Sequence, residues 1–337
     1  MENISIAIDG GHSMFKVRAA SLASPDKRYT FQIPTVVMPA ITLTNEQTLQ
    51  KAELETVELD GRKYFFGETA LRQGRSEVFT GQNAEWIDTP QHDVLVLGAW
   101  RKVMQSFGNQ PARVHLVMGL PAKFVGPQRD TLRKRMLALL TPRLLPGQTL
   151  RVMVQSQADA PLQWLSIQRD GAFAPHRDLD NEAWGVIEIG HYTTDFALSD
   201  RGAMLEYAAV SCPGMHLVYD GMSSAMSQEK LPTSLDIVET AIRNGSIKLY
   251  GQSVDVSHLL TQAKAGFEAV VMDEADRIFG QRAAVLDGII VGGGGAELLL
   301  SRLKERYPNA VSSEEPRMMV AEGFCRLGLL SLLQSHG

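Results

Sequence analysis

A turn near the start of the chain combines an acidic residue with glycines, hydroxyls and a lysine. In "IAIDGGHSMFKV" an alternating apolar run ends at Asp9, and Lys16 follows seven residues later. Glycines allow a turn to approach an anion closely, and its N–H groups and a hydroxyl such as that of Ser13 can hold phosphate oxygens. The residues that this chemistry would use are Asp9, Gly10, Gly11, His12, Ser13 and Lys16.

A second turn, in the middle of the chain, repeats the pattern. The segment "IEIGHYTTDFAL" again runs from an apolar strand through a glycine into an outgoing strand that carries Asp195. Backbone N–H groups and the hydroxyl of Thr193 would be the donors to a phosphate. The candidate residues here are Glu188, Gly190, His191, Tyr192, Thr193 and Asp195.

The carboxylates of Asp9 and Asp195 cannot favourably touch a phosphate directly. They suit a Mg²⁺ ion that bridges phosphates and keeps several of its waters, so we expect them to bind the metal through water. A plain β-hairpin is the alternative, because Asp-Gly between apolar runs is the strongest short-range hairpin signal. His12 and His191 suit turn stabilisation as well as phosphate donation, and neither has metal-ligand spacing with another His or Cys.

Four glycines, Gly292, Gly293, Gly294 and Gly295, separate the apolar strand "GIIV" from the helix "AELLL". Such a run lets a flat ring lie against bare backbone, and the helix that follows offers free N–H groups in a first turn that carries Glu297. A flexible strand-to-helix turn is the alternative. The run lacks the Lys-Ser/Thr of a P-loop and lies far from the first strand, which excludes a Walker site and a Rossmann fingerprint.

The elements that would position these turns follow one order twice. Strands followed by helices, occurring in both halves, predict an α/β protein of two similar domains. The polar stretch 42–55 is expected to be an exposed loop, and Asp60-Gly61 a second hairpin without chemistry. Helices are expected at 92–108, 127–140, 158–167, 235–243 and 257–279.

Composition excludes several classes of protein. The 337 residues carry a net charge of −5, which gives no basic surface for direct nucleic-acid binding. Cys212 and Cys325 lie in apolar surroundings and are expected to be buried, reduced thiols. No apolar stretch reaches the roughly 18 to 20 residues that span a bilayer, and no secretory signal is recognised, so we expect a cytoplasmic protein without membrane contact. The apolar segment at the carboxyl end is expected to be a core-packing helix.

Together these motifs resemble the actin and heat-shock-chaperone ATPase superfamily, and within it most closely the bacterial plasmid-segregation actins of the ParM/StbA group. "IAIDGGHSMFKV" and "IEIGHYTTDFAL" are similar to the two phosphate segments, and "IIVGGGGAEL" is similar to the adenosine motif. "HLVMGLPAKF" and "VAEGFCRLG" resemble the two connecting segments.

The resemblance implies an α/β, actin-like fold, with two RNase H-like lobes around a nucleotide cleft. Domain I would comprise 1–165 and 317–337, with a small subdomain at about 31–85. Domain II would comprise 166–316, with a small subdomain at about 214–282.

Roles for single residues follow from the resemblance. Lys16 would match the family's phosphate-contacting lysine, and the glycine run would hold the adenine and α-phosphate. Glu239 and Arg243 are candidates for ribose or base contacts. Gln157 would position the attacking water, with Gln155 as the alternative; glutamine orients water but is a poor base, so slow hydrolysis is expected.

One candidate departs from the family pattern. Glu188 stands where the family usually has an aspartate, which leaves its part in Mg²⁺ binding open.

The function implied is a slow ATPase that uses ATP, or alternatively GTP, with Mg²⁺ and assembles head to tail into filaments. An adaptor protein bound to plasmid DNA would couple the filament to plasmid segregation. Two alternatives are a small-molecule kinase of the same fold, with Asp130 or Asp159 as general base, and a nucleotide-responsive scaffold that does not polymerise.

Overall fold

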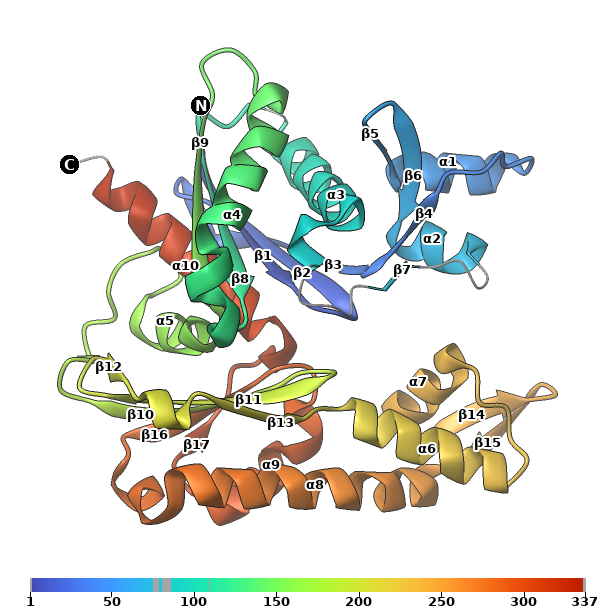
Figure 1. Ribbon diagram of the computed structural model, residues 1–337, viewed down its shortest axis with the longest axis vertical. Coiled ribbons are helices and arrows are strands. Elements are labelled where there is room, and N and C mark those ends of the chain that lie inside the picture. Colours follow the sequence, from blue (N-terminus) through green and yellow to red (C-terminus); the bar gives the residue numbers. More distant parts are fainter. Residues whose placement is uncertain (1, 75–78, 81–85, 109, 336–337) are drawn as a thin grey trace. The chain divides into compact units, whose positions relative to one another are not determined.

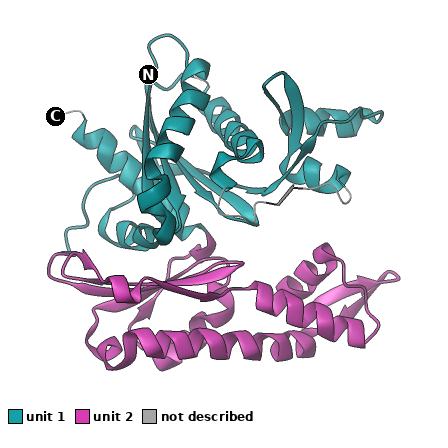
Figure 2. Ribbon diagram, in the orientation of Figure 1, with its two compact units in different colours: residues 1–178, 318–337 teal, residues 179–317 magenta. Residues whose placement is uncertain are grey.

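The computed structural model describes residues 2–74, 79–80, 86–108 and 110–335, which form two compact units (Figures 1 and 2). Unit 1 comprises Met1–Asp178 and Met318–Gly337, and unit 2 comprises Leu179–Arg317. The predicted domain boundary after residue 165 lies within helix α5 (Ala160–Ser166), thirteen residues before the end of the first segment of unit 1. Part of the predicted small subdomain, 75–78 and 81–85, lies outside the described residues.

The main sheet of unit 1 has the strand order β3-β2-β1-β8-β9. Strands β1, β2 and β3 form an antiparallel meander, while β8 and β9 continue the sheet parallel to β1. The bounds are β1 (Asn3–Gly10), β2 (Met14–Ser21), β3 (Ser24–Pro34), β8 (Arg113–Leu120) and β9 (Thr149–Ser156).

Helices cover both faces of this sheet. Because side chains alternate along a strand, Ile4, Ile6 and Ile8 of β1 enter one core with residues of α3 and α4, whereas Ala7 enters another with α5 and α10. The helix bounds are α3 (Pro90–Ser106), α4 (Ala122–Leu140), α5 (Ala160–Ser166) and α10 (Met319–Gln334). The closing helix α10 therefore packs in the core, as its sequence predicted.

A smaller part of unit 1 holds a four-stranded sheet of order β5-β6-β4-β7. The bounds are α1 (Glu46–Leu54), α2 (Gly67–Gln73), β4 (Val36–Pro39), β5 (Thr56–Leu59), β6 (Arg62–Phe66) and β7 (Phe79–Thr80). The hairpin at Asp60-Gly61 is confirmed. The loop predicted for 42–55 is wrong, since α1 forms there with Asn45 as its N-cap; Ala52 alone is buried, so the helix has almost no apolar stripe to reveal it.

Unit 2 repeats the strand pattern of unit 1. Its sheet has the order β12-β11-β10-β16-β17, with β13 also paired to β11; β10 is antiparallel to β11 and parallel to β16. The bounds are β10 (Ala183–Ile189), β11 (Thr193–Asp200), β12 (Ala203–Met204), β13 (Val210–Pro213), β16 (Gly288–Gly292) and β17 (Ala310–Val311). The prediction of two similar α/β domains is confirmed.

The long helix α8 runs beside α6 in unit 2, and a small hairpin, β14-β15, precedes it (Figure 1). The bounds are α6 (His216–Gln228), α7 (Leu235–Asn244), β14 (Ser246–Leu249), β15 (Gln252–Asp255), α8 (Ser257–Phe279) and α9 (Ala296–Arg306). The 3₁₀ turns are η1 (Trp86–Asp88), η2 (Thr141–Arg143), η3 (Gln157–Asp159), η4 (Glu206–Ala208), η5 (Gly280–Val285) and η6 (Pro316–Met318).

The five predicted helices are present, and one begins five residues earlier than expected. Helix α4 starts at Ala122 and contains Pro127 in its interior. The prediction began the helix at Pro127 because proline favours the first turn.

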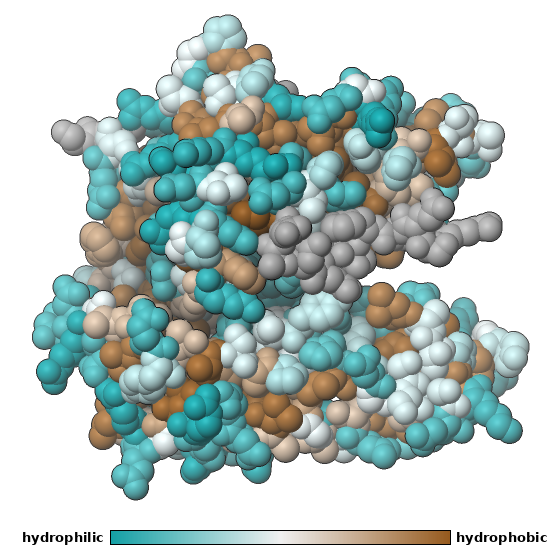
Figure 3. Space-filling view, viewed as in Figure 1, coloured by the Kyte–Doolittle hydropathy of each residue, from teal (hydrophilic) through white to brown (hydrophobic). Residues whose placement is uncertain are grey.

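Polar and charged residues cover much of the face seen in Figure 3, and hydrophobic residues form separate patches on each unit. Within the described part of the chain, no helix has the length and apolarity needed to cross a membrane. Both cysteines are free thiols. Burial is confirmed for Cys325 but wrong for Cys212, which is partly exposed because β13 joins the sheet beside β11 through four residues only.

Candidate functional site

The first candidate turn joins β1 to β2 as a hairpin, with Asp9 directly opposite Lys16 in the antiparallel register. Asp9 is 3% exposed, and its Oδ2 accepts a hydrogen bond from Lys16 Nζ at 3.1 Å. Side chains opposite each other on antiparallel strands lie on one face of the sheet, which brings the two charges together. The carboxylate is thus held at the carboxyl end of β1 and is compensated by a cation of the same hairpin.

Gln157 joins this pair from a distant part of the chain. It follows β9 and donates from Nε2 to Asp9 Oδ1 at 2.7 Å. Gly119 of β8 makes room for it, because a Cβ there would lie 2.7 Å from Gln157 Cγ. Gln155, the alternative, lies two residues before Gln157. It is paired with Gly119 in the register of β8 and β9. The structure therefore brings Asp9, Lys16 and Gln157 into one cluster.

The turn itself is held in a fixed shape. Gly11 N donates to Asp9 O at 3.0 Å, and a Cβ on Gly11 would lie 2.8 Å from Met14 O, so a side chain there would force the turn to shift. Thr35 braces the turn by donating from N to Ser13 O at 3.0 Å and from Oγ1 to Gly11 O at 2.7 Å. Thr35 has no signal in the sequence, because its contact depends on the register of β3 rather than on a local pattern.

The second candidate turn joins β10 to β11 in the same way. Glu188 is opposite Asp195, at the positions that correspond to Asp9 and Lys16 in unit 1. Gly190 N donates to Thr193 O at 2.9 Å, and a Cβ on Gly190 would lie 2.8 Å from the same oxygen. Glycine is required here for the same steric reason as at Gly11.

Asp195 is held by two hydroxyl groups. Its Oδ2 accepts a hydrogen bond from Thr193 Oγ1 at 3.0 Å, and its Oδ1 accepts one from Ser211 Oγ of β13. The side chain is partly exposed, so water reaches it. Ser211 was missed by sequence analysis, since only the pairing of β11 with β13 places it opposite Asp195.

The start of α6 packs against the second turn. Gly214, Met215 and His216 donate their backbone N–H groups to the carbonyls of Tyr192, Gly190 and His191 at 2.9, 3.0 and 2.7 Å. A Cβ on Gly214 would lie 2.7 Å from Gly190 O. Gly214 is therefore a further glycine on which the turn depends.

Aromatic rings surround His191. Its ring lies edge-on to Tyr192 at 4.7 Å and to Tyr219 at 4.9 Å between centroids, and Tyr192 stacks on His216 at 5.9 Å. These contacts agree with a turn-stabilising part for His191, one of the two interpretations that its sequence position allows.

The glycine run lies against the end of β10. Gly293 has φ of +91°, and a Cβ there would lie 2.3 Å from Ile189 O. Gly295 N donates to Ile189 O at 3.0 Å, and a Cβ on Gly295 would meet the Ile189 side chain at 2.4 Å. Close packing thus requires Gly293 and Gly295, whereas Gly294 is partly exposed and a Cβ there would meet Arg317 Nε at 3.8 Å, an ordinary contact distance. Helix α9 begins here with no side chain capping its N–H groups, and Glu297 in its first turn is exposed.

Charged side chains gather near Tyr219, beside the glycine run. Glu239 and Arg243 form an ion pair on α7 at 2.7 Å between Oε1 and Nη2. Burial, and then the charge of Glu239, raise the pKa of Tyr219, while Arg317 and Arg243 lower it. Gly293 N donates to Pro316 O, and Arg317 Nε is the nearest group that a Cβ on Gly294 would meet, at 3.8 Å. Arg317 was not a candidate in the sequence, because no motif marks it.

The donor chemistry fits a hard cation held through water. Among the described residues, no group of three or more His, Cys, Asp or Glu side chains is arranged to ligate a metal directly. Asp9 and Asp195 each accept two hydrogen bonds, and a carboxylate has about four acceptor positions, so each can also accept from metal-bound water. Their part in binding Mg²⁺ stays a prediction.

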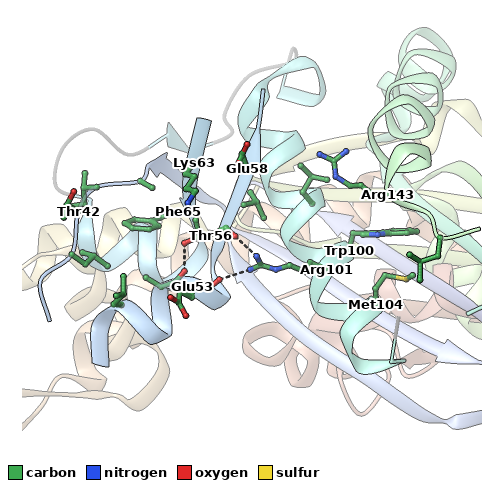
Figure 4. Close-up of a pocket in the computed structure, with 18 of the residues that line it drawn as sticks. Thr42, Glu53, Thr56, Glu58, Lys63, Phe65, Trp100, Arg101, Met104 and Arg143 are labelled. Carbon is green, nitrogen blue, oxygen red and sulfur yellow. Dashed lines mark hydrogen bonds between the residues drawn. The ribbon is translucent and has the colours of Figure 1, made fainter. Parts of the chain in front are cut away.

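A cavity of about 910 Å³ lies elsewhere in unit 1, between α3 and the α1-β5-β6 part (Figure 4). Trp100, Met104 and Phe65 line it, and Arg101 closes one side by donating to the carbonyls of Thr56, Glu53 and Leu54. Its lining includes none of the candidate residues.

Comparisons with known proteins agree with the repeated topology. The family model described as the N-terminal domain of actin-like proteins matches residues 7–157, and the C-terminal model of archaeal MreB-like actin homologues matches 186–305. No curated protein matches the sequence.

Several solved structures share the fold. A ParM filament from Clostridium botulinum has 18% identity and a TM-score of 0.72, covering 97% of this chain and 99% of that one. An archaeal actin homolog has 15% identity and a TM-score of 0.72, with 98% and 99% covered. Bacillus thuringiensis ParM with ATP has 14% identity and a TM-score of 0.64, covering 99% of this chain and 100% of that one. The two family models and this fold show that the chain belongs to the actin-like superfamily, with ParM proteins among its structural neighbours.

Proposed function

We propose that the chain is a nucleotide-dependent, filament-forming actin-like ATPase. The observation that carries this proposal is the cluster of Asp9, Lys16 and Gln157, which places a buried carboxylate, a cation and an amide at the first phosphate turn. This combination suits the electrostatic demands of phosphoryl transfer, which needs positioned charge rather than covalent chemistry from the protein.

Each residue of the cluster has a distinct part in the proposal. Lys16 would donate to phosphate oxygens, and Asp9 would hold water of the Mg²⁺ that neutralises the phosphate charge. Gln157 would orient the attacking water; an amide cannot serve as a strong base, so turnover would be slow. ATP is the proposed nucleotide, and GTP is the alternative.

Unit 2 supplies the second set of groups in the proposal. The turn from Gly190 to Thr193 would hold phosphate oxygens, and Asp195 would bind the metal through water. Gly294, Glu239 and Arg243 would contact the nucleoside, and the N-terminus of α9, which has no side-chain cap, would face its phosphates.

Assembly and partners are proposed from the relatives. One structural neighbour is a ParM filament, and another is a ParM with ATP. By this likeness, the chain would assemble head to tail in the cytoplasm and move plasmid copies through an adaptor bound to DNA. The net charge of −5 agrees with an indirect link to DNA.

The kinase alternative has one observation in its favour. Burial raises the pKa of Asp159, which follows Gln157 by two residues, and a raised pKa suits a general base. Asp130 is instead largely exposed on α4, 3.5 Å from Arg133. Transfer of phosphate to a hydroxyl acceptor rather than to water would select this alternative.

Purified protein with Asp9→Asn, Gln157→Leu or Asp130→Asn tests the proposal. Mg-ATP binding is measured by calorimetry, hydrolysis by phosphate release and assembly by light scattering. We expect Asp9→Asn to lower affinity or turnover at least about tenfold, equivalent to about 1.4 kcal/mol, and Gln157→Leu to lower turnover while affinity stays within about twofold. Asp130→Asn is the control and should match the wild type. Normal hydrolysis by Asp9→Asn would refute the assignment.

A further inference from the structure

The cavity of about 910 Å³ in unit 1 lies between two hydrophobic cores (Figure 4). Trp100 and Met104 of α3 belong to the main core of the unit, whereas Ala52 of α1 and Phe65 of β6 belong to a smaller one. All four side chains line the cavity. Ligand pockets in proteins measure about 300 to 1,000 Å³ and have mostly apolar walls, so this cavity has the size and the lining of a small-molecule site.

Three exposed apolar side chains gather at the same cavity. Ile41, Leu49 and Leu145 line it and are 50%, 44% and 52% exposed. Leu49 and Ala52 are three residues apart on α1, so they share one face of that helix. This face lines the cavity, which explains why α1 buries so little within the chain. A ligand with an apolar body would cover these side chains and gain the burial that the chain itself does not provide.

Two arginines bring positive charge to the cavity without an acidic partner. Arg101 donates only to three carbonyl groups where α1 meets β5, and Arg143 donates only to the carbonyl of Leu139. Within the described part of the chain, neither guanidinium forms an ion pair. Carbonyl groups orient a guanidinium, but they carry no net charge that would balance it. A guanidinium has five N–H donors, so both arginines keep donors for a ligand.

Two carboxylates also line the cavity, and neither pairs with these arginines. Glu58 lies opposite Lys63 in the register of β5 and β6, where opposite charges offset each other. Glu53 is exposed on α1. Burial lowers the pKa of Arg101, and no acidic side chain among the described residues counteracts this effect. The two arginines therefore remain available to an anionic group, which a guanidinium can bind through two parallel hydrogen bonds.

We propose that this cavity binds one small amphipathic acid, a molecule with an apolar ring or chain and a carboxylate, sulfonate or phosphate group. The apolar body would lie against Trp100, Met104 and Phe65. The acidic group would accept hydrogen bonds from Arg143, with Arg101 adding positive charge. The cavity shares no residue with the candidate phosphate turns, so this inference does not depend on the proposed ATPase function.

Fluorescence titration of the full chain with anilinonaphthalene sulfonate tests the acidic group. The neutral anilinonaphthalene has the same rings without the sulfonate and is the reference compound. We expect Arg143→Gln to weaken binding of the sulfonate at least about fivefold while binding of the neutral compound stays within about twofold. Arg133→Gln, at an exposed arginine of α4 outside the cavity, is the matched control and should bind both compounds as the wild type does.

A second pair of variants tests the apolar wall. Leu145→Ser removes exposed apolar surface at the cavity and should weaken binding of both compounds at least about threefold. Leu235→Ser, at an exposed leucine of unit 2, is its control and should change neither affinity. Neither substitution removes a buried side chain, so both variants should keep the fold of the wild type.

Mg-ATP is present throughout, so that the proposed nucleotide site is not open to the probe. A sulfonate that does not bind, or that binds Arg143→Gln and Leu145→Ser as tightly as the wild type, overturns the inference, whether or not the protein hydrolyses ATP. Decanoate and naphthoate are then added as competitors. The stronger competitor identifies the apolar body as a chain or a ring, and the absence of competition by both also overturns the inference.

Discussion

The carboxylate of Glu322 on α10 is the centre of a buried charge cluster whose removal has a calculable effect. It accepts hydrogen bonds from Arg18 Nη1 at 2.9 Å, from Arg28 Nε and Nη2 at 3.2 and 3.1 Å, and from Arg326 Nε at 2.8 Å. Arg326 also donates to the carbonyls of Trp164 and Ile167, so the cluster ties α5 to α10. The perturbation is Glu322→Gln, which keeps the shape and removes the charge.

The magnitude follows from the pKa of Glu322. Burial alone would raise this pKa, but the hydrogen bonds and charges of Arg28 and Arg326 outweigh burial and lower it from 4.5 to about 2. At about 1.36 kcal/mol per pKa unit, the lowered pKa contributes roughly 3 kcal/mol of stability at neutral pH. Because the folded pKa is the lower one, this contribution is complete above about pH 4.5 and is lost as the pH falls toward 2. Glu322→Gln should therefore cost about 3 to 5 kcal/mol at pH 7, since it also leaves buried arginines without a counter-charge.

Urea unfolding followed by tryptophan fluorescence at several pH values between 7 and 3 measures the effect. The difference between wild type and Glu322→Gln should shrink by about 2 kcal/mol over this range, because the wild type approaches its protonated state. The control is Glu68→Gln, which removes an exposed ion pair with Arg72 and should change stability by less than about 1 kcal/mol. A difference between wild type and Glu322→Gln that is independent of pH would refute the reasoning.

Three further substitutions test the turns. Gly293→Ala forces an alanine to φ of +91° with its Cβ 2.3 Å from Ile189 O, so thermal unfolding should show a loss of at least about 2 kcal/mol. Gly294→Ala, with its nearest new contact at 3.8 Å, should cost less than about 1 kcal/mol, and equal losses would contradict this account. Lys16→Met leaves the buried Asp9 without its cation and should lower stability by about 3 kcal/mol at pH 7 and weaken Mg-ATP binding. Unchanged values in denaturation and calorimetry would exclude Lys16 as the compensating charge.

The sequence was sufficient to locate both hairpin turns, because their signals are local. Alternating apolar residues around a glycine define strand, turn and strand, and the repeat of that order predicted two α/β units of one topology. The residues that brace the turns had no such signal. Thr35, Ser211 and Gly214 meet the turns only through strand register and helix placement, which a single sequence does not reveal.

The glycine run shows that one sequence pattern can have two physical causes. The sequence pattern allowed either a flat ligand lying on bare backbone or a flexible strand-to-helix turn. In the structure, Gly293 and Gly295 are required by the backbone and side chain of Ile189, which is packing within unit 2. Gly294 is the position that remains open to a ligand, with Arg317 nearest to it. The sequence alone could not separate ligand binding from close packing as the cause, because both require a residue without a Cβ.

The two units place different charges at equivalent positions of one topology. In unit 1 Asp9, near the end of β1, faces Lys16 on β2 and forms an ion pair with it. In unit 2 Glu188 faces a second acid, Asp195, and acids directly opposite each other on antiparallel strands repel. Hydroxyl donors on Asp195 reduce that repulsion without cancelling the charge. A divalent cation held through water would reduce this repulsion, which agrees with the part proposed for Asp195 in binding Mg²⁺.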